Sequence, residues 1–307
     1  MADVIERARR FARPYRVDHG RKFRLRDFDP DDIGELSAKD KPQALEALEL
    51  GTQAICELQD RLYAQDRWAL LLVFQAIDAA GKDSAIKHVM SGINPQGCQV
   101  CSFKSPSAED LDHDFLWRCT KALPERGRIG IFNRSYYEEI VVVRVHPELL
   151  DRQKVPPELL KNKGLWQDRA HDIRNFESYL ARNGTIVRKF FLNVSRKEQE
   201  KRFRERLEKP EKNWKFSAED LKEREYWKQY QNAYEDMIRW TATAEAPRFV
   251  VPADHKWYTR VVVAAAIVDA LAGLKLKYPE VSKTQSVEIA RARKTLGLDG
   301  RRRGAAA

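Results

Sequence analysis

A run of small and polar residues follows a short apolar segment in the first third of the chain. Residues 76–84, AIDAAGKDS, place Gly81 and Lys82 as in the phosphate-binding loop G-x-x-x-x-G-K-[ST]. Ala76 takes the place of the first glycine, and Asp83 takes that of the final hydroxyl residue. Backbone N–H groups in such a turn converge on an anion. The spacing predicts a phosphate site; the alternative is a strand–turn–helix junction with an exposed lysine.

The same loop carries an acidic residue, which phosphate alone would repel. Asp78 becomes favourable there if a cation lies between its carboxylate and the phosphate, so it is a candidate magnesium ligand or proton acceptor. Asp78 and Lys82 are therefore the expected catalytic residues of the loop. The expected phosphate-binding residues are Ala79, Ala80, Gly81, Lys82, Asp83 and Ser84.

A second polar group lies in GIFNRSYYEE, residues 130–139. Ligands of open α/β sheets bind at the carboxyl ends of strands, and this segment begins as a strand. Arg134 can clamp a phosphoryl group with two hydrogen bonds. Asn133 stands where phosphate-loop enzymes place an acid that orients magnesium, so it is the second candidate metal ligand. Glu138 is a candidate nucleotide contact; the alternative for the whole group is a strand-end turn with a surface arginine.

The third group is the basic segment SRKEQEKRFRERLEKPEKNWKFS, residues 195–217. Arg202 and Arg206 are four residues apart, so they share one helical face and are candidate phosphate contacts. Glutamates alternate with these cations, and a solvated, self-paired helix face is the alternative interpretation.

These groups need a scaffold that brings them together, and the apolar pattern predicts one. Short apolar runs alternate with amphipathic segments, which indicates β-α-β units and an α/β fold with a doubly wound, parallel, five-stranded sheet flanked by helices. The expected strands are 68–77, 98–103, 128–133, 185–194 and 248–253. The expected helices are 42–66, 81–91, 107–123, 138–145, 164–184 and 257–278.

Three regions are predicted along the chain. Residues 1–40 are polar, broken by proline and glycine, and form an arm with little regular structure. Residues 41–276 form the domain, in which 195–246 hold two helices separated by KPEKNWKF and no strand. This insertion is expected to be a lid that closes over the site, or else a fixed helical insertion. Residues 277–307 form a tail, partly disordered, that ends in RRRGAAA.

Composition narrows the class of protein. The formal net charge of +10 favours an anionic partner. The sequence has no apolar run of membrane-spanning length and no signal-peptide core, so we expect a cytoplasmic protein with no membrane partner. Four cysteines fit a reducing compartment. Cys98 and Cys101 form a C-x-x-C without a second pair, so they are expected to be strand residues and not metal ligands.

Several motifs in a fixed order resemble those of the family-2 polyphosphate kinases, over roughly residues 40–275. Within that family, the chain is most similar to the subgroup that acts on both nucleoside mono- and diphosphates. The motifs are DAAGKD (78–83), GINPQG (92–97), SFKSPS (102–107), HDFLWR (113–118) and GIFNRSYYEE (130–139), followed by the basic segment.

The resemblance implies a phosphate-loop kinase fold related to thymidylate kinase, with a helical lid. It implies Mg²⁺-dependent, reversible phosphoryl transfer between inorganic polyphosphate and nucleotides, converting AMP to ADP and ADP to ATP, or the guanine equivalents. It also implies a homodimer or homotetramer. The family's functional positions correspond to Asp78, Lys82, Asn133, Arg134, Arg202 and Arg206, and Lys104 of SFKSPS joins the expected phosphate- or nucleotide-binding residues.

Two other functions are compatible with the residues alone. An ATP-dependent nucleotide kinase of the thymidylate kinase type would share the fold and differ in its donor. A basic nucleic-acid-binding module would explain the net charge without chemistry. Because the loop and the strand-end groups point to phosphoryl transfer, we expect no specific nucleic-acid partner.

Overall fold

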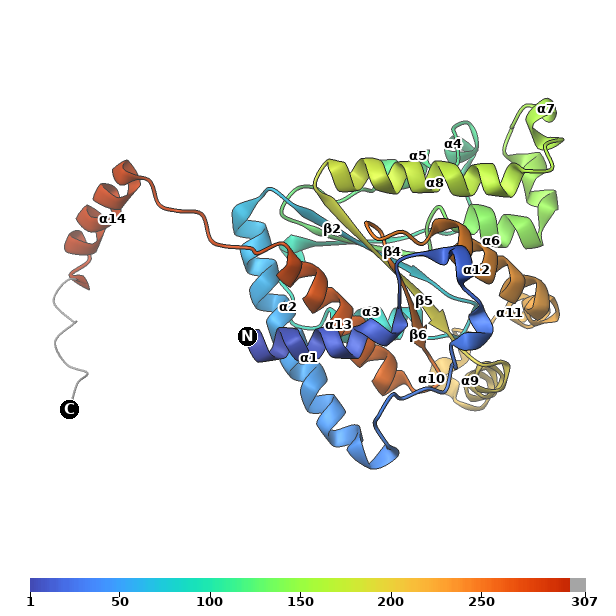
Figure 1. The fold of residues 1–307 in the computed structure, drawn as a ribbon, viewed down its shortest axis with the longest axis horizontal. Coiled ribbons are helices and arrows are strands. Elements are labelled where there is room, and N and C mark those ends of the chain that lie inside the picture. The colour runs from blue at the N-terminus through green and yellow to red at the C-terminus, as the bar shows by residue number, and fades with distance from the viewer. Residues whose placement is uncertain (299–307) are drawn as a thin grey trace. The chain divides into compact units, whose positions relative to one another are not determined.

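The computed structural model describes residues 1–298, and its centre is a mostly parallel sheet (Figure 1). The sheet has the order β1-β6-β5-β2-β4-β3, and the five predicted strands pair in parallel. Every residue of β2 is buried, as expected for a central strand covered on both faces. The prediction of a doubly wound sheet is confirmed. The five strands are β2 Ala69–Gln75, β3 Cys98–Ser102, β4 Ile129–Asn133, β5 Thr185–Asn193 and β6 Arg248–Pro252.

The N-terminal arm is structured, contrary to the prediction. It forms α1 (Ala2–Ala12) and a sixth strand, β1 (Arg16–Val17), which pairs antiparallel with β6. Ala8 and Ala12 are buried and belong to the hydrophobic core, although arginines separate them in the sequence. Buried Tyr15 shares a 2.8 Å hydrogen bond with the hydroxyl of Tyr258. Residues Met1–Leu276 consequently form one compact unit.

Helices cover both faces of the sheet (Figure 1). α1, α2 (Lys41–Gln65), α3 (Lys82–Val89) and α13 (Lys256–Gly273) pack together on one face. The other face carries α6 (Glu138–Val145), α8 (Leu165–Arg182) and α12 (Trp227–Thr241). α8 ends before Gly184, whose φ of +80° gives the left-handed turn predicted there. None of the helices among residues 1–298 is long and apolar enough to cross a membrane.

The single helix predicted over 107–123 is wrong, because the segment breaks in the middle. The predicted helix start is correct: Ser107 and Asp110 form a reciprocal capping box. The side chain of Asp114 accepts a 2.9 Å hydrogen bond from the amide of Leu116, a local turn that competes with helix. Two short helices result, α4 (Ala108–Leu111) and α5 (Trp117–Lys121).

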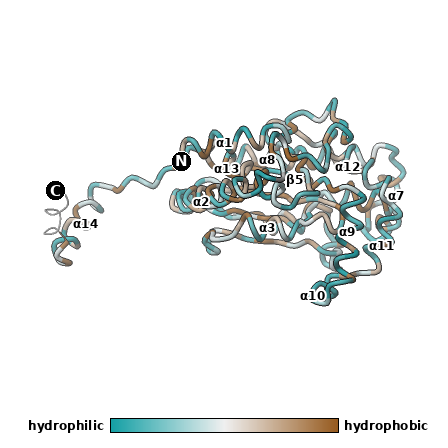
Figure 2. The backbone as a smooth tube through the Cα atoms, turned by 90° about the horizontal axis from the view of Figure 1, so that it is seen from below, coloured by the Kyte–Doolittle hydropathy of each residue, from teal (hydrophilic) through white to brown (hydrophobic). Residues whose placement is uncertain are grey.

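The insertion between β5 and β6 is helical, but it is not two helices with a plain linker. α9 (Arg196–Glu208) is followed by α10 (Pro210–Asn213), which lies within KPEKNWKF, and by α11 (Ala218–Glu223). α12 belongs to the core, since its Tyr230, Tyr234 and Met237 are buried. The residues around α10 are mostly hydrophilic (Figure 2). The part of the predicted lid that is free of the core is therefore α10 and α11 with the end of α9.

The remaining short elements connect the main ones. Residues 277–298 belong to a second unit and contain α14 (Lys283–Thr295), which Ser282 caps. The predicted disorder of RRRGAAA falls outside the described residues. The connecting helices are η1 Arg13–Tyr15, η2 Gly20–Lys22, η3 Leu25–Asp27, η4 Ala38–Asp40, η5 Pro95–Gly97, η6 Pro147–Arg152, α7 Pro157–Leu160 and η7 Arg224–Tyr226.

Candidate active site

A cavity of about 490 Å³ lies where β2, β3 and β4 end and α9 passes over the loop after β2. The registers of the parallel strands bring their carboxyl ends to one edge of the sheet. All predicted site residues except Glu138 line this cavity, and Glu138 lies next to it through Arg134. The lining residues that were predicted are Asp78, Ala79, Ala80, Gly81, Lys82, Asp83, Ser84, Lys104, Asn133, Arg134, Arg202 and Arg206.

The loop has the strained backbone of an anion site. Ala79 has φ +61° and Gly81 has φ +104°, so the chain turns sharply just before α3 begins at Lys82. A left-handed alanine costs of order 1 kcal/mol and persists only when its surroundings hold it. The ammonium group of Lys82 donates a 2.8 Å hydrogen bond back to the carbonyl of Ala76. Burial lowers the pKa of Lys82, and the Asp78 carboxylate opposes that shift.

Three successive loop carbonyls are bound by one helix, α9. The side-chain amide of Gln199 donates a 2.9 Å hydrogen bond to the backbone carbonyl of Asp78. The guanidinium of Arg202 donates a 3.1 Å hydrogen bond to the carbonyl of Ala79 and a 2.7 Å hydrogen bond to that of Ala80. Gln199 and Arg202 are three residues apart and therefore share one helix face. Since a peptide plane points its N–H away from its C=O, binding the Ala80 carbonyl turns the Gly81 amide away from α9.

The other donors of Arg202 also have acceptors within the protein. They reach the carbonyls of Ala253 at 2.5 Å and Asp254 at 3.2 Å, and the carboxylate of Glu198 at 3.0 Å. Arg202 is 5% exposed, and a guanidinium has five N–H donors. Each donor has an acceptor within the protein, so Arg202 holds the loop from behind in this structure, and its contact with a phosphate stays a prediction.

The predicted metal and phosphate residues of the loop and of β4 contact each other. Arg134 has a left-handed backbone with φ +65°. Its guanidinium donates a 2.9 Å hydrogen bond to the carboxylate of Asp78, and its other terminal nitrogen lies 3.8 Å from the carboxylate of Glu138. Its backbone amide donates to the carbonyl of Phe74 at 3.0 Å, which fixes it beside β2. Burial raises the pKa of Glu138, against the opposing charges of Arg134 and Lys82.

Oxygen atoms suited to a hard cation gather at the mouth of the loop. The side-chain amide of Asn133 donates a 2.7 Å hydrogen bond to the carboxylate of Asp83. This hydrogen bond joins the end of β4 to the start of α3. Asp78, Asp83 and the Asn133 carbonyl are oxygen donors of the type that Mg²⁺ prefers. Among residues 1–298, no group of three or more acidic, His or Cys side chains could hold a metal by itself. A cation here would therefore need phosphate and water as further ligands, as Mg²⁺ commonly does.

A basic rim completes the cavity, and part of it was not predicted. Arg206 pairs with Asp220 at 3.0 Å, while its guanidinium lies 5.2 Å from the ring centroid of Phe203. Sequence reasoning missed three lysines and Gln199. The basic composition of KPEKNWKF points to two of the lysines, and Gln199 lies one turn before Arg202, but nothing local marks the third lysine at the start of α13. The missed lysines are Lys212, Lys215 and Lys256.

The turn that carries Arg134 and Glu138 is anchored in the core. Tyr136 and Tyr137 are fully buried, and their hydroxyls donate to one carboxylate oxygen of Glu177 at 2.9 and 2.7 Å. The other oxygen accepts a 2.6 Å hydrogen bond from Lys189, whose pKa burial lowers to about 8. The two tyrosines are therefore packing residues, and they position the turn that carries Arg134 and Glu138.

The fold and this cavity define a phosphate-loop phosphotransferase, and comparison with known proteins makes the class specific. A family model described as polyphosphate kinase 2 (PPK2) matches residues 36–279. The chain is 48% identical over 282 residues to the ADP-polyphosphate phosphotransferase of Rhodopseudomonas palustris, covering 90% of this chain and 98% of that protein. It is 43% identical over 266 residues to the AMP/ADP-polyphosphate phosphotransferase of Meiothermus ruber, covering 87% and 95%.

A solved structure supports the same class of protein. The crystal structure of polyphosphate kinase 2 from Arthrobacter aurescens TC1 superposes with a TM-score of 0.84 at 37% identity, covering 92% of this chain and 96% of that one. The chain belongs to the polyphosphate kinase 2 family. Family membership disfavours both rival functions, the ATP-dependent nucleotide kinase and the nucleic-acid-binding module.

Proposed function

We propose that this enzyme transfers the terminal phosphoryl group of inorganic polyphosphate to AMP or ADP, or to the guanine equivalents, and catalyses the reverse reaction. The observation that carries the proposal is the cavity itself, in which eight basic side chains and three acidic ones surround a phosphate-binding loop. A linear polyanion fits such a surface, since phosphoryl transfer depends on positioning and charge neutralisation.

In the proposed mechanism, Lys82 and the loop amides hold the terminal phosphates of the donor chain. An oxygen of the acceptor phosphate attacks the terminal phosphorus in line, and the bond from that phosphorus to its bridging oxygen breaks. The electron pair stays with the shortened chain, so no phosphoenzyme forms. Arg134, released from Asp78 or Glu138 by the incoming polyanion, and Arg206 neutralise the charge that develops on the transferred group.

We propose Mg²⁺ as the cofactor, with Asp78, Asn133 and Asp83 as the residues that would hold it. Their oxygen donors and the neighbouring phosphate cavity suit a hard divalent cation. When bound, the cation neutralises charge on the phosphate oxygens.

An assay that compares phosphoryl donors tests this proposal. The chain is incubated with AMP or ADP and Mg²⁺, once with long-chain polyphosphate and once with ATP or GTP as the only donor. We expect product with polyphosphate, and loss of at least about 100-fold in kcat for Lys82→Ala, as for removal of one electrostatic transition-state contact. Transfer that occurs only with the nucleoside triphosphate would support the thymidylate kinase type of reaction instead.

Two predictions from the sequence are kept as proposals, a cytoplasmic location and a homodimer or homotetramer. Four free cysteines agree with a reducing compartment. Cell fractionation tests the first, and size-exclusion chromatography with light scattering tests the second. A membrane-associated fraction or a monomeric mass would contradict them.

A further inference from the structure

Gln199 on α9 connects the phosphate-binding loop to the segment that follows the lid helices. Its side-chain nitrogen donates a 2.9 Å hydrogen bond to the backbone carbonyl of Asp78, and its side-chain oxygen accepts a 2.9 Å hydrogen bond from the guanidinium of Arg224. Arg224 begins η7, directly after α11. Gln199 is 1% exposed, so water does not readily replace either partner. A single buried side chain therefore joins the start of η7 to the catalytic loop.

The two partners fix the orientation of the Gln199 amide. A backbone carbonyl only accepts hydrogen bonds and a guanidinium only donates them, so the amide nitrogen faces Asp78 and the amide oxygen faces Arg224. Without Arg224, the buried oxygen would lose the hydrogen bond that fixes it, which is costly for a polar atom away from water. The position of Arg224 therefore decides where Gln199 directs its donor.

Arg224 is bound along one face of α9. Its guanidinium donates 3.4 Å hydrogen bonds to the carbonyl of Arg196 and to the carboxylate of Glu200. It also lies 6.0 Å from the ring centroid of Phe203, and its side chain is 15% exposed. Positions 196, 199, 200 and 203 are three or four residues apart, so they share one helix face. A single side chain thus docks the start of η7 on α9.

The junction between α11 and η7 is where the free part of the lid meets the core. Glu223, one residue before Arg224, accepts a 2.6 Å hydrogen bond from the hydroxyl of Tyr230 and lies 3.0 Å from Nε2 of His146. Tyr230 is buried on α12, and His146 directly follows α6. Movement of α10 and α11 about this junction would therefore act first on Arg224.

The loop needs an outside hold at the point that Gln199 reaches. Ala79 lies in the left-handed region with φ +61°, and the carbonyls on its two sides are held by different side chains. Gln199 binds the carbonyl of Asp78, and Arg202 binds that of Ala79 itself. A strained alanine persists only when its surroundings hold it. Loss of the Gln199 hydrogen bond would let the peptide between Asp78 and Ala79 turn.

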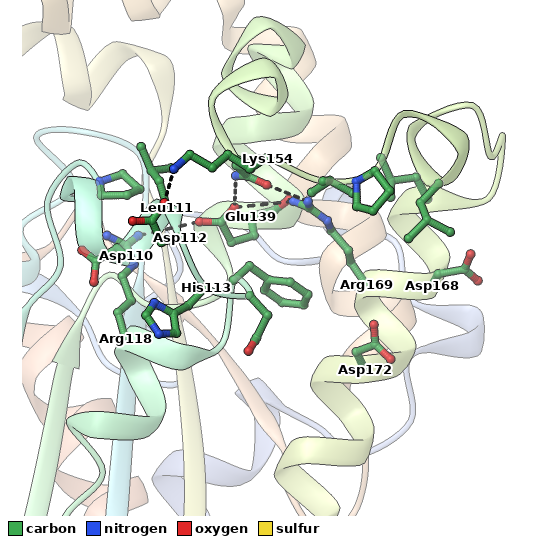
Figure 3. Close-up of a pocket in the computed structure, with 18 of the residues that line it drawn as sticks. Asp110, Leu111, Asp112, His113, Arg118, Glu139, Lys154, Asp168, Arg169 and Asp172 are labelled. Carbon is green, nitrogen blue, oxygen red and sulfur yellow. Dashed lines mark hydrogen bonds and ion pairs between the residues drawn. The ribbon is translucent and has the colours of Figure 1, made fainter.

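The turn after β4, on the other side of the active site, is held by groups of the core. Buried Glu139 accepts hydrogen bonds from Gln153 at 2.6 Å and from Arg169 at 3.5 Å. Figure 3 shows Glu139 between Arg169 and Arg118, whose guanidinium lies 3.7 Å from the carboxylate. These partners lie on α5, on α8 and just after η6. The core thus holds this turn, while the end of the lid reaches the loop.

We propose that Gln199 and Arg224 are positioning residues for phosphoryl transfer, which couple the docking of η7 on α9 to the shape of the phosphate-binding loop. This inference rests on the proposed phosphotransferase function. With Arg224 docked, Gln199 holds the carbonyl of Asp78, and the loop keeps the shape in which it faces the phosphates. Neither side chain lines the active-site cavity, so their loss should act on kcat and much less on substrate binding.

The test uses full-length variants of both residues. Gln199→Leu removes both hydrogen bonds, Gln199→Glu keeps an acceptor for Arg224 but loses the donor to Asp78, and Arg224→Met removes the other end of the link. The matched controls are Gln229→Leu on α12 and Lys222→Met on α11, whose side chains are exposed. kcat, KM for ADP and KM for polyphosphate are measured for each variant and for the double variant Gln199→Leu with Arg224→Met. Melting temperatures show that each variant is folded.

We expect each of the three single variants to lower kcat by about 10- to 100-fold, as for a displaced catalytic loop, while each KM changes by less than about threefold. In the double variant, kcat should stay within about threefold of the slower single variant, because both substitutions break one link. The controls should keep the kcat of the wild type. Amide hydrogen exchange of residues 79–82, measured without substrates, should be faster in Gln199→Leu and in Arg224→Met than in the wild type.

Unchanged kcat in Gln199→Leu or in Arg224→Met, even with a lower melting temperature, would mean that the pair only supports folding and would overturn the inference. Losses of kcat that multiply in the double variant would also overturn it, since they would show two independent effects. If the wild type does not transfer phosphate from polyphosphate, the proposed function fails instead. Exchange of residues 79–82 then still decides whether Gln199 and Arg224 hold the loop.

Discussion

The guanidinium of Arg202 lies 2.7 Å from the carbonyl oxygen of Ala80, and this contact joins α9 to the phosphate-binding loop. Because the same guanidinium also binds the carbonyls of Ala79 and Ala253, it ties the loop to the end of β6 as well. The catalytic loop is thus held from behind by a cation that is saturated with hydrogen bonds. We therefore expect the first half of α9 to stay with the loop if the predicted lid moves.

Replacement of Arg202 by Met should lower kcat by about 100-fold, since a loop displaced by about 1 Å misaligns the reacting groups. KM for polyphosphate should change by less than tenfold, because the donors of Arg202 are bound by backbone carbonyls and Glu198. Arg204→Met is the matched control on the same helix, where the side chain is 70% exposed and pairs with Glu200. Free guanidinium added to Arg202→Ala should restore part of kcat.

A different result would support the predicted contact of Arg202 with phosphate. If the Met variant keeps kcat but loses polyphosphate affinity, and the salt dependence of binding becomes weaker, then Arg202 contacts phosphate directly. Hydrogen exchange at the Gly81 and Lys82 amides provides a second readout. Exchange should become faster in the variant if Arg202 holds the loop.

Asp78→Asn tests the acid within the loop. The substitution keeps the shape and removes the charge that faces Arg134 at 2.9 Å and the proposed cation. We expect kcat to fall by about 100-fold or more and the Mg²⁺ concentration for half-maximal rate to rise. Asp151→Asn, an exposed acid in η6, serves as control. An unchanged Mg²⁺ requirement would contradict the assignment of Asp78 as a metal-binding residue.

The lysines of KPEKNWKF should contribute affinity for the chain and little to chemistry. Lys212 and Lys215 line the cavity rim, beyond the loop. The double Ala variant should raise KM for long polyphosphate and reduce the slope of log KM against log salt by about 1 to 2, with kcat nearly constant. Lys161→Ala with Lys163→Ala, outside the residues that line the cavity, is the control pair. A large loss of kcat would place these lysines in the transfer step.

Glu138→Gln should separate stability from activity. Burial raises the folded-state pKa of Glu138 above its ordinary value of about 4.3. Between those two values the folded state binds more protons than the unfolded state, so this group makes stability fall as pH rises through that window. The Gln variant should therefore melt at a higher temperature at neutral pH and lose this dependence. Since Glu138 lies 3.8 Å from Arg134, the variant should also be less active.

Thermal melting checks the predicted stability of the Glu138→Gln variant. Thermal melts of both proteins between about pH 4.3 and neutrality show whether the difference in melting temperature grows with pH. A Gln variant that is less stable than the wild type at neutral pH would mean that the ion pair with Arg134 outweighs the cost of burying Glu138.

The sequence predicted which residues gather around the cavity better than it predicted their contacts. Apolar runs and strand ends are local patterns, so the five parallel strands and the gathering of Asp78, Lys82, Asn133 and Arg134 followed from them. The contacts of Arg202 did not, because spacing along a helix shows which face a side chain shares but not what lies opposite. Its acceptors at Ala80 and Ala253 come from segments far away in the chain.

The prediction that the N-terminal arm has little regular structure failed for a related reason. Its charged residues dominate its composition, yet Ala8, Ala12 and Tyr15 bury small or amphipathic surfaces against α13. Such contacts depend on the shape of the partner, which local hydropathy does not report. Likewise, the break after α4 depends on a side-chain hydrogen bond of Asp114, which competes with a helix that the pattern favoured.

The most direct measurement follows a labelled phosphoryl group. Polyphosphate that carries radioactive phosphorus at its ends is mixed with the chain, Mg²⁺ and unlabelled ADP, with no ATP present, and the product is examined within a single turnover. Direct transfer predicts that the label appears in the γ-phosphate of ATP while the polyphosphate shortens, and that Lys82→Ala forms no labelled ATP. Release of the label as inorganic phosphate, with no labelled ATP, would contradict the central claim that polyphosphate is the phosphoryl donor of this enzyme.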